Sequence, residues 1–206
     1  AAVHEPYQDG PRVARVEPLV LRRGGAGAVG VVCQGDGFRD YHLFGLDAGQ
    51  RIEVAGAPLE ATARYAFVRT AEGQVERMAL VDGTQVACGK ARLSLPAAPA
   101  GTVLAVRRAE AGDGEDALIV DVPIPPRQGQ PHERVLVEFG DGSTFGLAVR
   151  EIRAHAGGQS VIALEHRPAF EVSADGSTAT HTHHPHRQMP GRPRFRLANV
   201  AGWERR

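Results

Sequence analysis

The sequence is poor in aromatic residues, which make up 5% of the chain, and it contains one tryptophan and one lysine, Lys90. Its 24 basic side chains balance its 24 acidic side chains, so the formal net charge is zero. A neutral chain is not expected to be a strongly basic nucleic-acid binder. No apolar run approaches the length of about 18 residues that a membrane-spanning helix needs. We therefore expect neither a nucleic acid nor a membrane as the partner.

Short motifs that identify common enzymes and metal proteins are also missing. The 206 residues contain no GxSxG elbow, no phosphate-binding Walker loop, no HExxH pair and no CxxC pair. The two cysteines, Cys33 and Cys88, each end a short apolar run that is typical of a buried strand. Each is expected to behave as a small hydrophobic side chain, and a disulfide between them stays open if their strands are neighbours.

Short apolar and β-branched runs, separated by glycine, proline and aspartate turns, dominate the 206 residues. Alternation with period two and turns every eight to twelve residues predict an all-β, antiparallel β-sandwich. The expected strands are residues 13–21, 29–33, 39–44, 64–68, 75–81, 92–95, 102–106, 118–122, 134–139, 145–152, 160–164, 170–172 and 195–197.

Pairs of an acidic residue and glycine mark four expected hairpin turns, because they adopt the positive φ angles of tight turns. These pairs are Glu72-Gly73, Asp82-Gly83, Asp141-Gly142 and Asp175-Gly176. A Pro- and Ala-rich stretch at 97–101 predicts a linker between two packed β sub-domains. The first sub-domain would be residues 1–96 and the second residues 102–206.

Four of the nine histidines cluster near the end of the chain: His181, His183, His184 and His186. Residues i and i+2 of a strand face the same way, so His181 and His183 would project together. Such a pair can start a site for a divalent metal such as Zn²⁺ or Cu²⁺, but a third ligand is needed. The alternative is an exposed polar strand that is rich in histidine by chance.

A second candidate cluster begins at Arg39 and includes Asp40, Tyr41 and His42. An arginine can neutralise a uronate carboxylate, and a tyrosine or histidine can move protons. Alternation places Tyr41 and His42 on opposite faces, which favours a strand with Tyr41 packed and with Asp40 and His42 solvated. Tyr7, in an extended segment set by Pro6, is a further ring that could stack on a sugar.

These segments together resemble the β-rich C-terminal region of heparinase II/III-like polysaccharide lyases. The similarity rests on residues 4–7 followed by a long strand, on residues 39–41, on residues 69–76 and on residues 80–84. It covers residues 2–95 best, and residues 102–206 look like the variable β tail of the same proteins.

The resemblance implies a non-catalytic β-sandwich domain that supports the catalytic domain or the substrate cleft. In that family an upstream α/α toroid supplies most catalytic residues, and none of those positions matches a residue here. The implied partners are this catalytic domain, an acidic polysaccharide or a second copy, in a bacterial protein that is secreted or periplasmic. Carbohydrate contacts are expected at Tyr7, Arg39 and Tyr41. The alternatives are a stand-alone carbohydrate-binding module and a metal-binding β-protein that uses residues 181–186.

Overall fold

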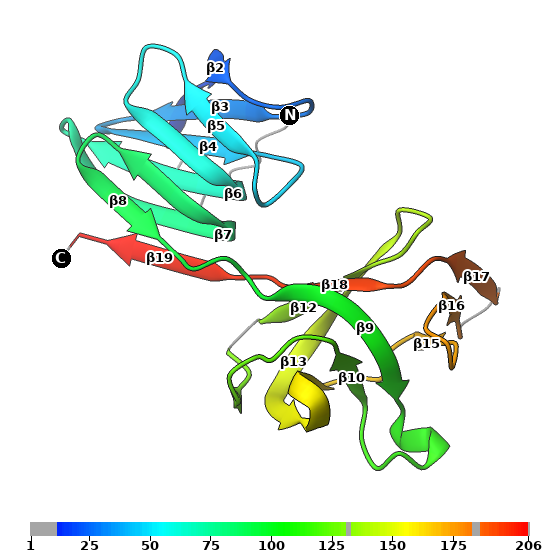
Figure 1. The fold of residues 1–206 in the computed structure, drawn as a ribbon. Helices are drawn as coiled ribbons and strands as arrows, with labels where there is room; N and C mark the ends of the chain where they lie inside the picture. Colours follow the sequence, from blue (N-terminus) through cyan, green and yellow to red (C-terminus); the bar gives the residue numbers. More distant parts are fainter. Residues whose placement is uncertain (1–11, 131–132, 183–185, 206) are drawn as a thin grey trace. The chain divides into compact units, whose positions relative to one another are not determined.

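The computed structural model describes residues 12–130, 133–182 and 186–205, and nearly all regular structure in them is β (Figure 1). Every strand pair that the structure records in these residues is antiparallel. The predicted all-β, antiparallel, sandwich-like fold is confirmed. No helix in the described part of the chain is long and apolar enough to cross a bilayer.

The chain divides into two compact units. The first unit is Ala1–Ala97 together with Asn199–Arg206, and the second unit is Ala98–Ala198. The sequence predicts a second sub-domain that runs to residue 206, and this is wrong for the last eight residues. They return to the first unit because strand β19 (Val200–Glu204) pairs with β7 (Gln74–Cys88).

The predicted linker is likewise shorter than expected, because strand β9 (Ala100–Arg107) already begins inside it. Its Ala100 pairs with Arg196 of strand β18 (Arg194–Leu197).

Strand β7 pairs with β6, β8 and β19 in one large sheet. The remaining strands of the first unit lie in this sheet, whose main path has the order β1-β3-β4-β6-β5-β2. They are β1 (Val13–Pro18), β2 (Leu21–Arg23), β3 (Val29–Gly35), β4 (Phe38–Phe44), β5 (Arg51–Val54), β6 (Leu59–Ala71) and β8 (Ala91–Ser94).

The long strands β6 and β7 form a hairpin whose turn is Glu72-Gly73, as predicted. Both turn residues have positive φ angles, 50° at Glu72 and 75° at Gly73, which suits a two-residue hairpin turn. The hairpin predicted at Asp82-Gly83 is wrong, because β7 runs through these residues without reversing. They lie opposite a register shift in β6 between Thr62 and Ala63, where the ladder is bulged.

Strand β6 belongs to two parts of the sheet. The first part of β6 pairs with β5, and its last part pairs with β4. Buried side chains from both parts form one core. They are Leu43, Ile52, Val54, Leu59, Ala61, Ala63, Ala66, Val68, Met78, Leu80 and Val86.

In the second unit a ring of pairings, β13-β12-β18-β9-β10-β14, closes because β13 also pairs with β14. A small sheet of β15, β16 and β17 adds to it. The strands not yet introduced are β10 (Ala117–Val120), β11 (Arg127–Gln128), β12 (Arg134–Glu138), β13 (Thr144–His155), β14 (Gln159–Leu164), β15 (Phe170–Val172), β16 (Thr178–His181) and β17 (Arg187–Pro190). Two short 3-10 turns are η1 (Ala109–Ala111) and η2 (Ala156–Gly158).

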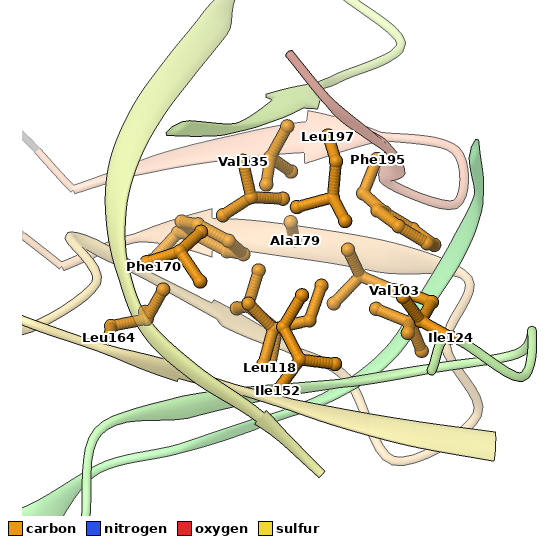
Figure 2. Packing of buried hydrophobic residues seen from close by; sticks show 14 of the residues in the cluster. Val103, Leu118, Ile124, Val135, Ile152, Leu164, Phe170, Ala179, Phe195 and Leu197 are labelled. Carbon is orange, nitrogen blue, oxygen red and sulfur yellow. The ribbon is translucent and has the colours of Figure 1, made fainter. Parts of the chain in front are cut away.

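The core of the second unit lies inside this ring, as Figure 2 shows. Leu118, Val135 and Ile152 come from three different strands of the ring and are fully buried. Phe170 and Ala179 reach the same cluster from β15 and β16. The small sheet therefore shares the core of the second unit rather than folding by itself.

Candidate functional site

Two adjoining hollows mark the most distinctive surface of the first unit. The first hollow, about 490 Å³, is lined by Arg39 and Tyr41 of β4 and by the β6–β7 turn. The second hollow, about 580 Å³, is lined by Lys90 and by Trp203 and Arg205 at the end of β19. The two share four lining residues, Pro58, Thr70, Gly73 and Cys88, and we call them together the end groove.

Positive charge gathers in the end groove. Arg39, Lys90 and Arg205 line it, and none of them has a carboxylate partner within 4 Å in the described residues. Glu72 is the single carboxylate among the lining residues. Elsewhere in the unit arginines are paired, as Arg77 is with Glu204 at 3.0 Å. The groove thus has an excess of two positive charges in a chain whose net charge is zero.

Two aromatic side chains accompany these cations. Tyr41 is half-buried, packs against the core of the unit and also lines the first hollow. Trp203 lines the second hollow and keeps 42% of its surface exposed. Rings of this kind have an apolar face and a polar end, which suits a ligand that is partly apolar and partly hydrated. Rings beside free cations can bind an acidic sugar by stacking and by charge-assisted hydrogen bonds.

The structure brings together two of the three residues predicted to contact carbohydrate, Arg39 and Tyr41. The third, Tyr7, lies outside the described residues. Sequence reasoning missed Lys90, Trp203 and Arg205. The one signal available was that Lys90 and Trp203 are the single lysine and the single tryptophan of the chain.

The other face of β4 differs from the sequence interpretation. Asp40 is 8% exposed, and its two carboxylate oxygens accept hydrogen bonds from Nε and Nη2 of Arg69 at 2.7 and 2.6 Å. The Nδ1 atom of His42 lies 3.0 Å from the hydroxyl of Tyr65. The expectation that both residues are solvated is wrong for Asp40, which is buried, whereas His42 is half-buried. The neighbouring strand β6 supplies Arg69, Tyr65 and Phe67 on the same face, and these side chains cover both.

Burial lowers the pKa of His42 from its usual 6.5, and the positive charge of Arg69 adds to this against the opposing effect of Asp40. The unfolded chain therefore takes up a proton near pH 6.5, whereas the folded chain does so only at lower pH. We predict that the free energy of unfolding decreases as the pH falls from 7.5 to 5.5. The variant His42→Gln should flatten this dependence in urea unfolding. An unchanged slope in His42→Gln would contradict this explanation.

The same face of the sheet carries an apolar row that crosses five strands. Register places Val29, Phe44, Tyr65, Val81 and Val200 side by side on β3, β4, β6, β7 and β19. Val29, Phe44 and Val200 are 44%, 41% and 66% exposed. An exposed apolar patch of this kind often marks a surface that contacts another protein or domain.

The histidine cluster gains no third ligand in the described residues. The ring of His181 stacks on Phe145, with centroids 5.4 Å apart and planes 13° apart, so it takes part in packing. His183 and His184 lie outside the described residues, and His186 follows them. Among the residues that the structure places, no group of three histidine, cysteine or acidic side chains could hold a metal ion.

Neither cysteine takes part in a disulfide, so the possible bridge between them is not formed. Cys33 lies on β3 opposite Asp40, whereas Cys88 ends β7 and lines the end groove. Because β3 and β7 are not neighbours in the sheet, the bridge lacks the adjacent strands that it requires. Burial raises the pKa of the Cys88 thiol, which keeps it in the less reactive protonated form at neutral pH.

Comparison with known protein families, curated proteins and solved structures finds no match for this chain. The resemblance to heparinase II/III-like lyases therefore stays a prediction from the sequence.

Proposed function

We propose that this chain is a non-catalytic module that binds an acidic polysaccharide in the end groove of its first unit. The observation that supports this most strongly is the convergence of Arg39, Lys90 and Arg205, without carboxylate partners within reach, beside Tyr41 and Trp203. Two of these residues are more than 100 positions away from the others along the chain. Their meeting is a product of the fold and not of local composition.

The chemistry of the groove suits a uronate or another acidic sugar. The guanidinium of Arg39 can donate two parallel hydrogen bonds to a carboxylate, and Lys90 offers a compact charge with three donors. Tyr41 and Trp203 offer ring faces to the C–H side of a sugar. No histidine lines the groove and Glu72 is its one carboxylate, so its lining lacks a pair of carboxylates or a carboxylate–histidine pair for acid–base catalysis.

In a heparinase II/III-like lyase, such a module would hold the polymer close to an upstream catalytic domain. The exposed apolar row from Val29 to Val200 supports a direct contact between this module and that catalytic domain. Both statements rest on the resemblance of residues 2–95.

Isothermal titration with sodium polygalacturonate tests the proposed function. We expect saturable binding that weakens at high salt, because exposed charges are screened. Neutral amylose should bind far more weakly. The variant Arg134→Gln is a matched control, since Arg134 is exposed in the second unit and has no ion pair in the described residues. Equal binding of the neutral and the acidic polymer would contradict the proposal.

The chain alone should not cleave the polymer. Incubation with polygalacturonate should give no rise in the ultraviolet absorbance of unsaturated products above a boiled control. A clear rise would show that the chain has lyase activity of its own.

A further inference from the structure

A third hollow extends the end groove along the surface of the same unit. It measures about 220 Å³ and is lined by Arg22, Glu53, Glu60 and Arg92. It shares Pro58 and Gly89 with the second hollow, which already shares four lining residues with the first. The three hollows therefore adjoin one another from Arg39 to Arg92, and we call this row of hollows the path.

Two arginines and two glutamates line the third hollow, so the lining itself is neutral. Glu53 accepts hydrogen bonds from Nε and Nη2 of Arg22 at 3.0 and 2.6 Å, and Nε of Arg51 lies 3.0 Å away. Arg51 also reaches Glu60 at 2.7 Å. Arg23 and Arg92 lie near these two carboxylates, at 3.9 and 4.0 Å. Arg23 and Arg51 thus add two positive charges beside the hollow, outside its lining.

The arginines keep donors for a ligand. A guanidinium has five N–H donors, and Arg22 uses two of its nitrogens on Glu53. Arg92 donates from Nη1 to Gln85 at 3.0 Å and is otherwise only loosely held. The side chains of Arg22 and Arg92 are 74% and 58% exposed. Both can therefore contact an anionic group without giving up a buried partner.

We propose that the ligand of this path is an extended acidic oligosaccharide with anionic groups at both ends of it, rather than a single sugar. This inference rests on the proposed function of the end groove. Arg39, Lys90 and Arg205 bind one part of the chain, and Arg22 and Arg92 bind a second part. Affinity therefore rises with chain length until the oligomer spans the three hollows.

The test is a titration of the full chain with oligogalacturonates of increasing, defined length. We expect the dissociation constant of the wild type to decrease with length and then level off. The variants Arg92→Gln and Arg22→Gln should weaken binding of long oligomers about threefold to fivefold, the range of an exposed charge contact. They should leave binding of the disaccharide unchanged. Arg134→Gln should match the wild type at every length, and urea unfolding checks that each variant folds.

The outcomes separate the two proposals. If no oligomer of any length binds, the proposed function of the end groove is wrong and the extension fails with it. If oligomers bind with one affinity at all lengths, and both variants match the wild type, only the extension is overturned. Weaker binding of long oligomers by Arg92→Gln and Arg22→Gln, but not by Arg134→Gln, supports the extension.

Discussion

Replacing Arg39, Lys90 and Arg205 together by glutamine should lower the affinity for acidic oligosaccharides about a hundredfold. The three cations line the end groove and have no carboxylate partners within 4 Å in the described residues. A bound anion would therefore supply the negative charge that pairs with them. A charge-assisted contact contributes about 1 kcal/mol at a partly exposed site, and three such contacts sum to about 3 kcal/mol. Isothermal titration at low salt measures the loss.

A control with the same change in charge separates the groove from a general effect of net charge. Arg134, Arg192 and Arg194 are exposed residues of the second unit, and none forms an ion pair in the part of the chain that the structure places. Their triple replacement by glutamine should leave affinity within about twofold of the wild type. An equal loss in both triple variants would mean that net charge, and not the groove, governs binding.

The variant Gly83→Ala should destabilise the first unit by about 3 kcal/mol. A Cβ atom at Gly83 would lie 2.3 Å from the Cβ of Ala63 and 2.4 Å from the carbonyl oxygen of Thr62. Both neighbours belong to the facing strand β6, and backbone atoms cannot yield without opening the β6–β7 ladder. Urea unfolding measures the change.

The same substitution should also weaken the groove. Asn199 is fixed at this point, because the amide of Gly83 donates to its Oδ1 and its Nδ2 donates to the carbonyl of Gly83, both at 3.0 Å. Residues Trp203 and Arg205 follow on β19 and line the second hollow. Loss of the contact at Asn199 should therefore lower oligosaccharide affinity as well as stability.

Gly202→Ala is the matched control for Gly83→Ala. A Cβ atom at Gly202 would meet its nearest neighbour, the carbonyl oxygen of Met78, at an ordinary 3.8 Å. We expect a change within about 0.5 kcal/mol. Similar stability of the two variants would contradict the close contact between Gly83 and β6 at the bulge.

Local sequence identified most of the strands and turns, although it missed β5, β11, β16, β17 and β19. It could not separate a hairpin from a bulge. Glu72-Gly73 and Asp82-Gly83 are the same type of pair, and the first residue of each has a positive φ, 50° and 52°. Only the first pair reverses the chain. The second lies beside a register shift in β6, which depends on how two distant strands pair. Such pairing involves residues that are far apart in the sequence, so the turn residues alone cannot predict it.

Only those residues of the end groove that lie close together along the sequence could be predicted. Alternation along β4 correctly separated Tyr41 from His42, which placed Arg39 and Tyr41 on the groove side. The contribution of Trp203 and Arg205 depends on the pairing of β19 with β7 across more than 100 residues of sequence. The burial of Asp40 depends on Arg69, 29 residues away on the next strand. No local pattern signals either contact.

The most direct test of the central claim uses Trp203, the single tryptophan of the chain. It is 42% exposed and lines the second hollow, so its fluorescence reports on the end groove alone. Titration with oligogalacturonate at low salt should give a saturable change in intensity or emission maximum, which the triple variant of Arg39, Lys90 and Arg205 loses. Oligosaccharide binding that calorimetry detects while the emission of Trp203 stays unchanged would place the ligand elsewhere and contradict the account.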